Sequence, residues 1–401
     1  MTKKSDAPAI RFKGFSDAWE QRKFSDITFP AGEKNKDNLP LESYSITNEH
    51  GFVPQDEKFE NGGTMREADK RMYYIVSPNS FAYNPARINV GSIGYQNIGK
   101  NVIVSSLYEV FKTSEDVDDR LLWHWFKSPD FQKLIMQLQE GGVRLYFYYD
   151  KLCMGEVSLP LLEEQRKIGK LFDTLDNLIT LHQRKFEKLT NVKKSMLEKM
   201  FPQNGSSYPE IRFKGFTDAW EQRKFSELVQ IERGGSPRPI DDFITDAPNG
   251  LNWVKIGDAP TQGNYITKTA EKIRPEGLSK TREVHPGDLI LSNSMSFGKP
   301  YIMGIDGCIH DGWLLIRNTY GVFDLTFLCH LLGTPQMLSQ YRSLAAGSTV
   351  NNLNKELVGN TVVTIPSITE QRVLGDYLEQ LDNLITLHQR QLFCIQPRIF
   401  L

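Results

Sequence analysis

Mostly apolar residues recur along two stretches of the chain at alternating steps of four and three positions. The first stretch runs from 168 to 200, and a shift of 206 residues finds the same pattern from 374 to 395. Residues spaced in this way line one side of a helix and require a second helix to cover them. The two stretches share ten identical residues, Leu175–Arg184 and Leu381–Arg390. We therefore predict two long helices that pair with each other as a coiled coil.

The repeated pattern also predicts which side chains lie between the two helices. A single stretch of this kind would be typical of an ordinary amphipathic core helix, and its duplication is what favours pairing. Two histidines occupy equivalent positions, where a polar residue more often fixes the register of paired helices than binds a metal or catalyses a reaction. The predicted positions for helix contact and partner docking are Ile168, Phe172, Leu175, Ile179, His182, Phe186, Leu374, Leu378, Leu381, Ile385 and His388.

The duplication extends beyond the helices. Eighteen residues at Ile10–Ile27 recur at Ile211–Leu228 with three conservative changes. Each copy is followed by about 130 residues, roughly 28–157 and 229–363, that show no convincing similarity to each other. Both halves then close with related phrases in which a proline precedes Glu-Gln-Arg, a signal for the start of a helix. The chain thus repeats one order twice: constant, variable, constant.

These boundaries divide the chain into alternating conserved segments and globular domains. Short strand-like runs and two helical stretches, 121–138 and 325–342, predict that each variable region is a self-contained domain of mixed α and β structure. The final residues 393–401 lack the lysine-rich turns that end the first long helix, so the second helix is expected to be shortened. We predict a conserved segment at 1–27, a domain at 28–160, a spacer helix at 161–202, a linker and repeated segment at 203–228, a second domain at 229–366, and a spacer helix at 367–401.

Composition narrows the possible functions. The 401 residues carry a net charge of −1, so no overall basicity indicates a nucleic-acid partner, although a basic face on one domain remains compatible with this balance. We find no apolar run long enough to cross a bilayer and no charged-then-apolar leader. Four cysteines without paired metal spacing are typical of free thiols in a reducing compartment. A cytoplasmic location is expected.

Motifs for catalysis are largely missing from the sequence. No phosphate-binding loop or dinucleotide turn is present. Asn84–Arg87 resembles the motif with which amino-methyltransferases hold a flipped base, but it lacks the second proline and the aromatic residue. Cys308, His310, Cys329 and His330 match no usual zinc spacing. We therefore predict no catalytic residue and no metal site.

Both variable domains instead contain loops that mix arginine or lysine with tyrosine, asparagine, serine and glycine. These are the side chains that meet phosphates and base edges. Each cluster alone is compatible with a solvated surface, but clusters at matching places in two halves favour binding. The candidates for DNA contact are Arg66, Lys70, Arg71, Tyr73, Asn84, Arg87, Arg144 and Tyr146 in the first domain, and Arg233, Ser236, Arg238, Lys280, Arg282, Ser294, Lys299, Ser348, Thr349 and Asn351 in the second.

Taken together, the paired Phe-Lys-Gly-Phe-Ser/Thr-Asp-Ala-Trp-Glu phrases, the Glu-Gln-Arg helix starts and the twin helices resemble those of specificity subunits of bacterial type I restriction-modification systems. The resemblance covers essentially the whole chain. It implies two globular target recognition domains joined by two long antiparallel helices, as a pseudo-twofold internal repeat. Each domain would read one half of a split sequence in double-stranded DNA.

The resemblance also implies partners. Two modification subunits, which bind S-adenosylmethionine and methylate adenine, would dock on the conserved helices, and restriction subunits would add ATP-driven translocation and cleavage. S-adenosylmethionine, ATP and Mg are therefore expected on partner subunits and no cofactor on this chain. About 30 helical residues span ~45 Å, a little more than one ~34 Å turn of duplex, so the helices would act as a ruler between two half-sites. The altered C-terminal residues put the docking of one modification subunit in doubt.

Two other functions are compatible with parts of the pattern. A structural adaptor would use the coiled pair to join two protein-binding domains, and its binding need not weaken steeply with salt as DNA binding does. A self-contained DNA methyltransferase would have to bind S-adenosylmethionine itself, which the missing cofactor loop argues against.

Overall fold

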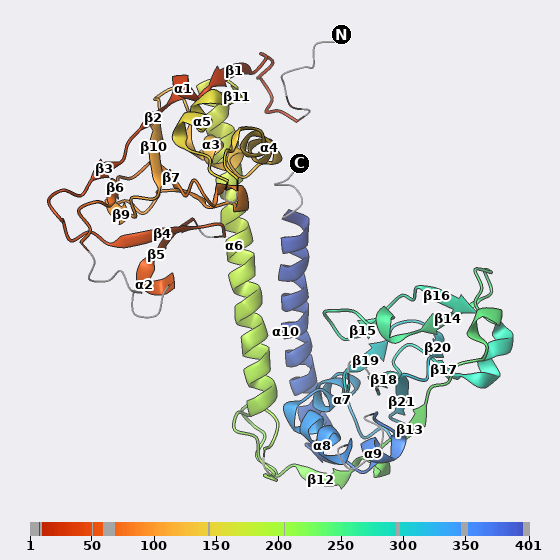
Figure 1. The fold of residues 1–401 in the computed structure, drawn as a ribbon. Helices are drawn as coiled ribbons and strands as arrows, with labels where there is room; N and C mark the ends of the chain where they lie inside the picture. The colour runs from red at the N-terminus through yellow and green to blue at the C-terminus, as the bar shows by residue number, and fades with distance from the viewer. Residues whose placement is uncertain are drawn as a thin grey trace. The chain divides into compact units, whose positions relative to one another are not determined.

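The computed structural model describes residue 8 and residues 10–395, except 50, 59–68, 143–144, 204, 294–296 and 346–351. The described chain forms two compact units, one reaching to Ile179 with Ile395 added and the other covering Thr180–Cys394, called unit 1 and unit 2 below. Figure 1 shows two long helices and, in each unit, a domain of short strands and helices. No helix of the described part is long and apolar enough to span a membrane.

Unit 1 contains two main sheets. The first is antiparallel with strand order β2-β10-β7-β8, and the second has order β3-β6-β9-β4-β5 with β4 and β9 parallel. The strand bounds are β2 Thr28–Pro30, β3 Glu33–Lys34, β4 Ser43–Thr47, β5 Gly51–Pro54, β6 Tyr74–Val76, β7 Phe81–Tyr83, β8 Ile93–Tyr95, β9 Val102–Val104 and β10 Glu109–Thr113.

Short helices and one small strand pair complete unit 1. Its main core is aromatic: the ring centroids of Phe81 and Phe111 lie 5.1 Å apart, and those of Phe126 and Phe131 lie 4.8 Å apart. β1 pairs with β11, which joins the first constant phrase to the end of the variable domain. The bounds are β1 Glu20–Lys23, α1 Phe24–Ile27, α2 Gln55–Lys58, η2 Ile88–Val90, α3 Asp119–Trp125, α4 Pro129–Leu138, α5 Tyr149–Met154 and β11 Glu156–Leu159.

Unit 2 also contains two main sheets, with orders β13-β21-β18-β19-β15 and β16-β14-β20-β17. β12 pairs with β22 as β1 pairs with β11. The bounds are β12 Glu221–Lys224, η3 Phe225–Glu227, β13 Gln230–Arg233, η4 Ile240–Asp242, β14 Leu251–Val254, η5 Ile256–Asp258, β15 Tyr265–Ile266, β16 Glu271–Ile273, η6 Pro275–Lys280, β17 Arg282–Val284, β18 Leu289–Ser292, β19 Pro300–Met303, β20 Gly307–Ile309, β21 Trp313–Arg317, α7 Leu325–Leu332, α8 Pro335–Ala345, α9 Lys355–Gly359 and β22 Val362–Ile365.

The two variable domains share one topology, which their sequences do not reveal. The antiparallel order β2-β10-β7-β8 matches β13-β21-β18-β19, and β6-β9-β4-β5 matches β17-β20-β14-β16 with the parallel pair at the same place. The helices correspond as well, because Asp118 caps α3 and Asp324 caps α7 at the equivalent position of the repeat. Two variable regions without convincing sequence similarity therefore form the same fold.

In each unit an equivalent glutamine on the long helix binds the variable domain. Gln165 Oε1 accepts from Asp118 N at 2.9 Å, and Gln371 Oε1 accepts from Asp324 N at 3.0 Å. Both glutamine side chains also donate to the carbonyl of the preceding proline. A glycine one turn later lets the capped helix approach, because a Cβ on Gly375 would lie 2.8 Å from Asp324 Oδ1. The Glu-Gln-Arg motif thus lies at the start of each long helix and also binds the variable domain through its glutamine.

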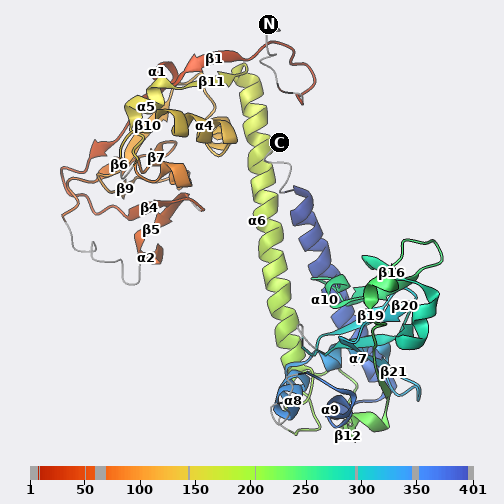
Figure 2. The same cartoon turned by 45° about the vertical axis from the view of Figure 1, so that its right-hand side comes forward.

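The long helices are α6, Leu162–Lys199, and α10, Ile368–Ile395. In both views α10 runs beside the C-terminal half of α6 (Figure 1, Figure 2). Within unit 2, His182 Nδ1 lies 2.9 Å from His388 Nδ1, and Lys193 pairs with Asp382. Because the partner of Lys193 lies earlier in the chain than the partner of His182, the helices are antiparallel. Equivalent histidines that face each other place a local twofold axis between them.

The predicted contact positions are less exposed than the helix residues around them, as the pattern requires. Leu374, Leu378, Leu381 and Ile385 are buried, and Leu175, Ile179, Phe186 and both histidines are half-buried. Two of the predicted positions pack against the variable domain of unit 1 and not against α10. Ile168 contacts the aromatic core, and the ring centroids of Phe172 and His124 lie 5.0 Å apart. The start of α6 therefore supports its own domain. Residues 396–401, which carry most of the altered C-terminal segment, lie outside the described residues.

Candidate nucleic-acid interface

Six of the predicted DNA-contact residues lie outside the described part of the chain. These are Arg66, Arg144, Ser294, Ser348, Thr349 and Asn351. The remaining candidates can be placed, and in each unit several of them come together.

In unit 1 the structure brings a turn after β7 beside a pair of tyrosines. Asn84 Oδ1 accepts from the backbone of Ala86 at 3.0 Å, which shapes the turn that carries exposed Arg87. A hydrogen bond from Phe147 N to Pro85 O, 3.0 Å long, fixes the segment 146–148 next to it. The rings of Tyr146 and Tyr148 stack with centroids 5.5 Å apart. An arginine beside partly exposed aromatic rings can contact phosphate and base together.

The other unit 1 candidates precede β6, on the second sheet. Arg71 is exposed, and its Nε lies 3.9 Å from Asp69 Oδ1. Lys70 is half-buried. Tyr73 corrects our prediction, because only 5% of it is exposed and burial raises the pKa of its hydroxyl. Its ring faces the interior and serves the packing of the domain, so we no longer regard Tyr73 as a surface contact.

In unit 2 four segments that are distant in sequence converge. Two glycines make this possible, since a Cβ on Gly234 would lie 2.2 Å from His310 O and one on Gly235 would lie 2.5 Å from Lys280 O. Past these glycines, Ser236 Oγ donates to Asp311 Oδ1 at 3.0 Å and Arg238 Nη2 lies 3.7 Å from Asp311 Oδ2. The Arg-Gly-Gly-Ser-Pro-Arg phrase, the residues around Lys280 and the turn at 310–312 therefore form one surface.

The fourth segment is the one that follows β18, and hydrogen bonds of Asn293 hold it at the same surface. Its side chain donates to Asp311 O at 2.7 Å, and its carbonyl accepts from Leu353 N at 3.0 Å. Exposed Lys299 follows, with Nζ 5.0 Å from the centre of the Tyr301 ring, while Lys280 lies over Phe243. Arg233, at the end of β13, is exposed. Of the predicted basic residues of unit 2, Arg238 therefore lies beside Asp311, and the backbone of Lys280 lies against Gly235.

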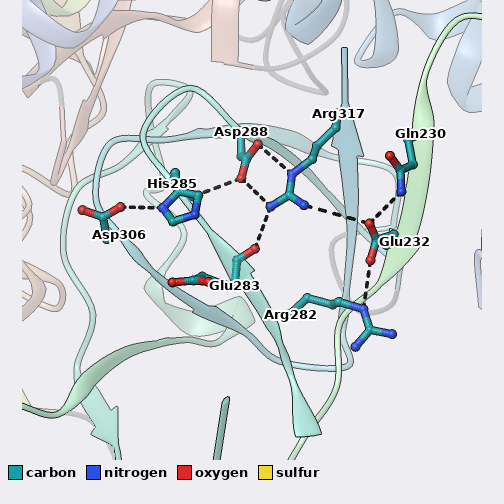
Figure 3. A network of polar contacts seen from close by, with 8 residues as sticks. All are labelled: Gln230, Glu232, Arg282, Glu283, His285, Asp288, Asp306 and Arg317. Carbon is teal, nitrogen blue, oxygen red and sulfur yellow. Dashed lines mark hydrogen bonds and ion pairs between the residues drawn. The ribbon is translucent and has the colours of Figure 1, made fainter. Parts of the chain in front are cut away.

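Arg282 is already engaged in a network that ties the sheets together (Figure 3). Its Nε lies 3.0 Å from Glu232 Oε2, and Arg317 lies 4.0 Å from the other oxygen of Glu232 while it also binds Asp288 at 3.2 Å. These carboxylates raise the pKa of the Arg317 guanidinium. The network joins β13, β17, β18 and β21, and its acidic groups offset the charge of its arginines. We interpret its role as holding the sheets in place.

Sequence reasoning missed His310 and Asp311 as members of this surface. His310 was weighed only as a zinc ligand, yet its Nε2 lies 2.9 Å from Asp311 Oδ1. Cys308 and Cys329 are buried, and burial raises the pKa of both thiols. Among the described residues no group of three potential ligands could hold a metal ion. The pairing of β13 with β21 places Asp311 near Ser236, and no local sequence signal indicates that pairing.

The model of the type I restriction modification DNA specificity domain matches residues 41–191 and again residues 217–394. The chain belongs to this family. A curated relative, the type I restriction enzyme MjaVIII specificity subunit of Methanocaldococcus jannaschii, is 24% identical over 73% of this chain and 70% of its own length. As a specificity subunit of a type I restriction-modification system, the chain is a DNA-recognition component and not a catalytic one.

Solved structures agree on the fold. The S subunit of a type I restriction-modification system from M. genitalium has a TM-score of 0.61 at 11% identity, with 98% of this chain and 96% of that chain covered. A chain from a study of complex assembly and conformational transition of the type I R-M system has a TM-score of 0.51 at 17% identity, with the same coverage. The specificity subunit therefore has the family's fold of two mixed α/β domains and two long antiparallel helices.

Proposed function

We propose that this specificity subunit reads a bipartite target in double-stranded DNA, one half with each domain, and that its helices carry two modification subunits and recruit restriction subunits. One observation carries the proposal: two domains of the same topology are fastened to two copies of one helix by the same glutamine contacts. Equivalent domains present equivalent reading surfaces, and different loop residues let each read a different sequence. S-adenosylmethionine, ATP and Mg would bind the partner subunits.

Exposed leucines on the long helices support the docking of partners. Leu384 and Leu387 on α10 are 44% and 48% exposed, and their equivalents in the first copy of the repeat, Leu178 and Leu181, are also exposed. The exposed leucines lie next to the residues that face the other helix. Each long helix therefore carries a strip of two exposed leucines beside that contact. Apolar surface of this kind is typical of a protein interface. A repeated strip suits two copies of one partner.

The proposal is tested by expressing the chain with a cognate modification subunit and mapping methyladenine across the genome. We expect a split motif with two defined halves. Leu384→Ser combined with Leu387→Ser removes one of the two strips and should lower methylation, and the same changes at Leu178 and Leu181 in addition should abolish it, while the purified chain still selects the same DNA. Leu107→Ser, which changes an exposed leucine of the unit 1 domain, is the matched control.

Two results would contradict the proposal. A chain that does not bind DNA, and that binds a protein partner with an affinity that does not fall steeply as salt rises, would favour the adaptor, because release of counterions from phosphates makes DNA binding salt-dependent. S-adenosylmethionine bound by the isolated chain would favour a methyltransferase.

A further inference from the structure

The turn between β20 and β21 places a carboxylate inside the basic surface of unit 2. Asp311 Oδ1 accepts from Ser236 Oγ at 3.0 Å and lies 2.9 Å from His310 Nε2. Asp311 Oδ2 faces Arg238, whose nearest nitrogen is 3.7 Å away and whose side chain is 82% exposed. One oxygen is therefore held by two neighbours, and the other faces a loosely held arginine.

A negative charge at this place needs a reason. A phosphate that approaches Arg238 would be repelled by the carboxylate of Asp311, whose Oδ2 lies 3.7 Å from Arg238 Nη2, so Asp311 weakens the non-specific part of DNA binding. A hydrogen bond to Ser236 accounts for one carboxylate oxygen, whereas the other oxygen would offset this loss if it made a contact that depends on the base. Carboxylates accept hydrogen bonds from the N4 amino group of cytosine in the major groove. Adenine also offers an amino group, but its adjacent N7 is an acceptor that would repel the second carboxylate oxygen.

We propose that Asp311 is a specificity-determining residue of unit 2 that accepts a hydrogen bond from the N4 amino group of a cytosine. Arg238 covers Oδ2 in the free protein and moves to a phosphate when DNA arrives, which leaves Oδ2 for the base. Ser236 and His310 keep the carboxylate oriented, and the close approach of Gly234 to His310 fixes Ser236 beside it. This proposal rests on the proposed function, and it names one contact within it.

The test selects binding sites for the full-length chain from a randomised double-stranded DNA library and repeats the selection with Asp311→Asn. Ser236 would keep the amide oxygen at the position of Oδ1, so the amide nitrogen would face the base and repel the cytosine amino group. At one position of one half-site the preference for cytosine should fall by about 5- to 150-fold. The other half-site should stay unchanged. Asp306→Asn is the matched control, since Asp306 is an exposed carboxylate of unit 2 that pairs with His285.

A second variant separates reading from folding. Ser236→Ala keeps every charge and removes one of the two groups that orient the carboxylate, so it should weaken the same cytosine preference to a smaller extent. The proposal is overturned if both half-sites survive Asp311→Asn, or if Arg238→Ala and Asp311→Asn change affinity equally for all sequences. A wild-type chain that selects no sequence at all would overturn the proposed function as well, so the two failures can be told apart.

Discussion

Replacing Glu370 with alanine should lower the free energy of unfolding of unit 2 by about 3 kcal/mol, the lower end of the cost of breaking a buried ion pair. Glu370 is only 3% exposed, and its oxygens accept from Arg212 Nε at 2.7 Å and Nη2 at 2.8 Å. Trp220 Nε1 donates to the same carboxylate at 3.3 Å. Alanine would leave the indole N–H without its acceptor, and it would leave a mostly buried guanidinium without its opposite charge and with only Asp218 O, 2.7 Å from Nη2, as an acceptor.

Urea denaturation of the full chain, followed by tryptophan fluorescence to which unit 2 contributes Trp220, Trp253 and Trp313, measures this loss. Glu221→Ala is the control, because Glu221 is an exposed glutamate of the neighbouring strand β12 that pairs with Arg223 at the surface. Equal stability of the two variants would show that the ion pair does not hold unit 2 together.

The duplication offers a second comparison in unit 1. Glu164 accepts from Arg11 at 2.7 and 2.8 Å, in the same bidentate geometry. In the part of the chain that the structure describes, Trp19 Nε1, the equivalent of Trp220 Nε1, has no hydrogen-bond partner. Glu164→Ala should therefore destabilise unit 1 less than Glu370→Ala destabilises unit 2.

The long helices and the duplicated order were predictable because helical periodicity is local. Steps of four and three residues place side chains on one side of a helix whatever the rest of the chain does. The sequence placed Glu164 and Glu370 in the first turns of the two helices, but it could not show that both carboxylates bind arginines far away in the chain. These ion pairs form only because the repeated segment with Arg11 lies against the start of α6 and the one with Arg212 lies against the start of α10.

The common topology of the variable domains was hidden for a different reason. Sheets are specified by which positions face the core, and many combinations of apolar residues satisfy the same pattern. Asp118 and Asp324 form the same cap at equivalent positions, yet two matching letters do not stand out among so many that differ. The basic loops of unit 2 were predicted residue by residue, whereas the position of Asp311 beside Ser236 depends on strand pairing and was missed. The prediction that Tyr73 lies at the surface was wrong, because an aromatic residue next to basic residues in the sequence is compatible with either a core or a surface position.

If the target is bipartite as proposed, lengthening both helices by one heptad should widen the gap between its two half-sites. A second copy of Leu175–Leu181 in α6 and of Leu381–Leu387 in α10 keeps the spacing of the apolar seam, because seven residues turn a helix back to within ~20° of its starting direction. The added ~10 Å corresponds to about three base-pair steps of ~3.4 Å. Both half-site sequences should be unchanged, since neither domain is altered.

Methyladenine mapping with the modification subunit reads the gap directly, and binding of the purified chain to duplexes with gaps of different length provides the same information without methylation. The matched control inserts the same seven residues after Tyr320, in an exposed turn where Gly321 meets open space. That insertion lengthens the chain equally but leaves both helices as they are, so the original gap should be retained. If the elongated helices also retain the original gap, the distance between the readers is not set by α6 and α10.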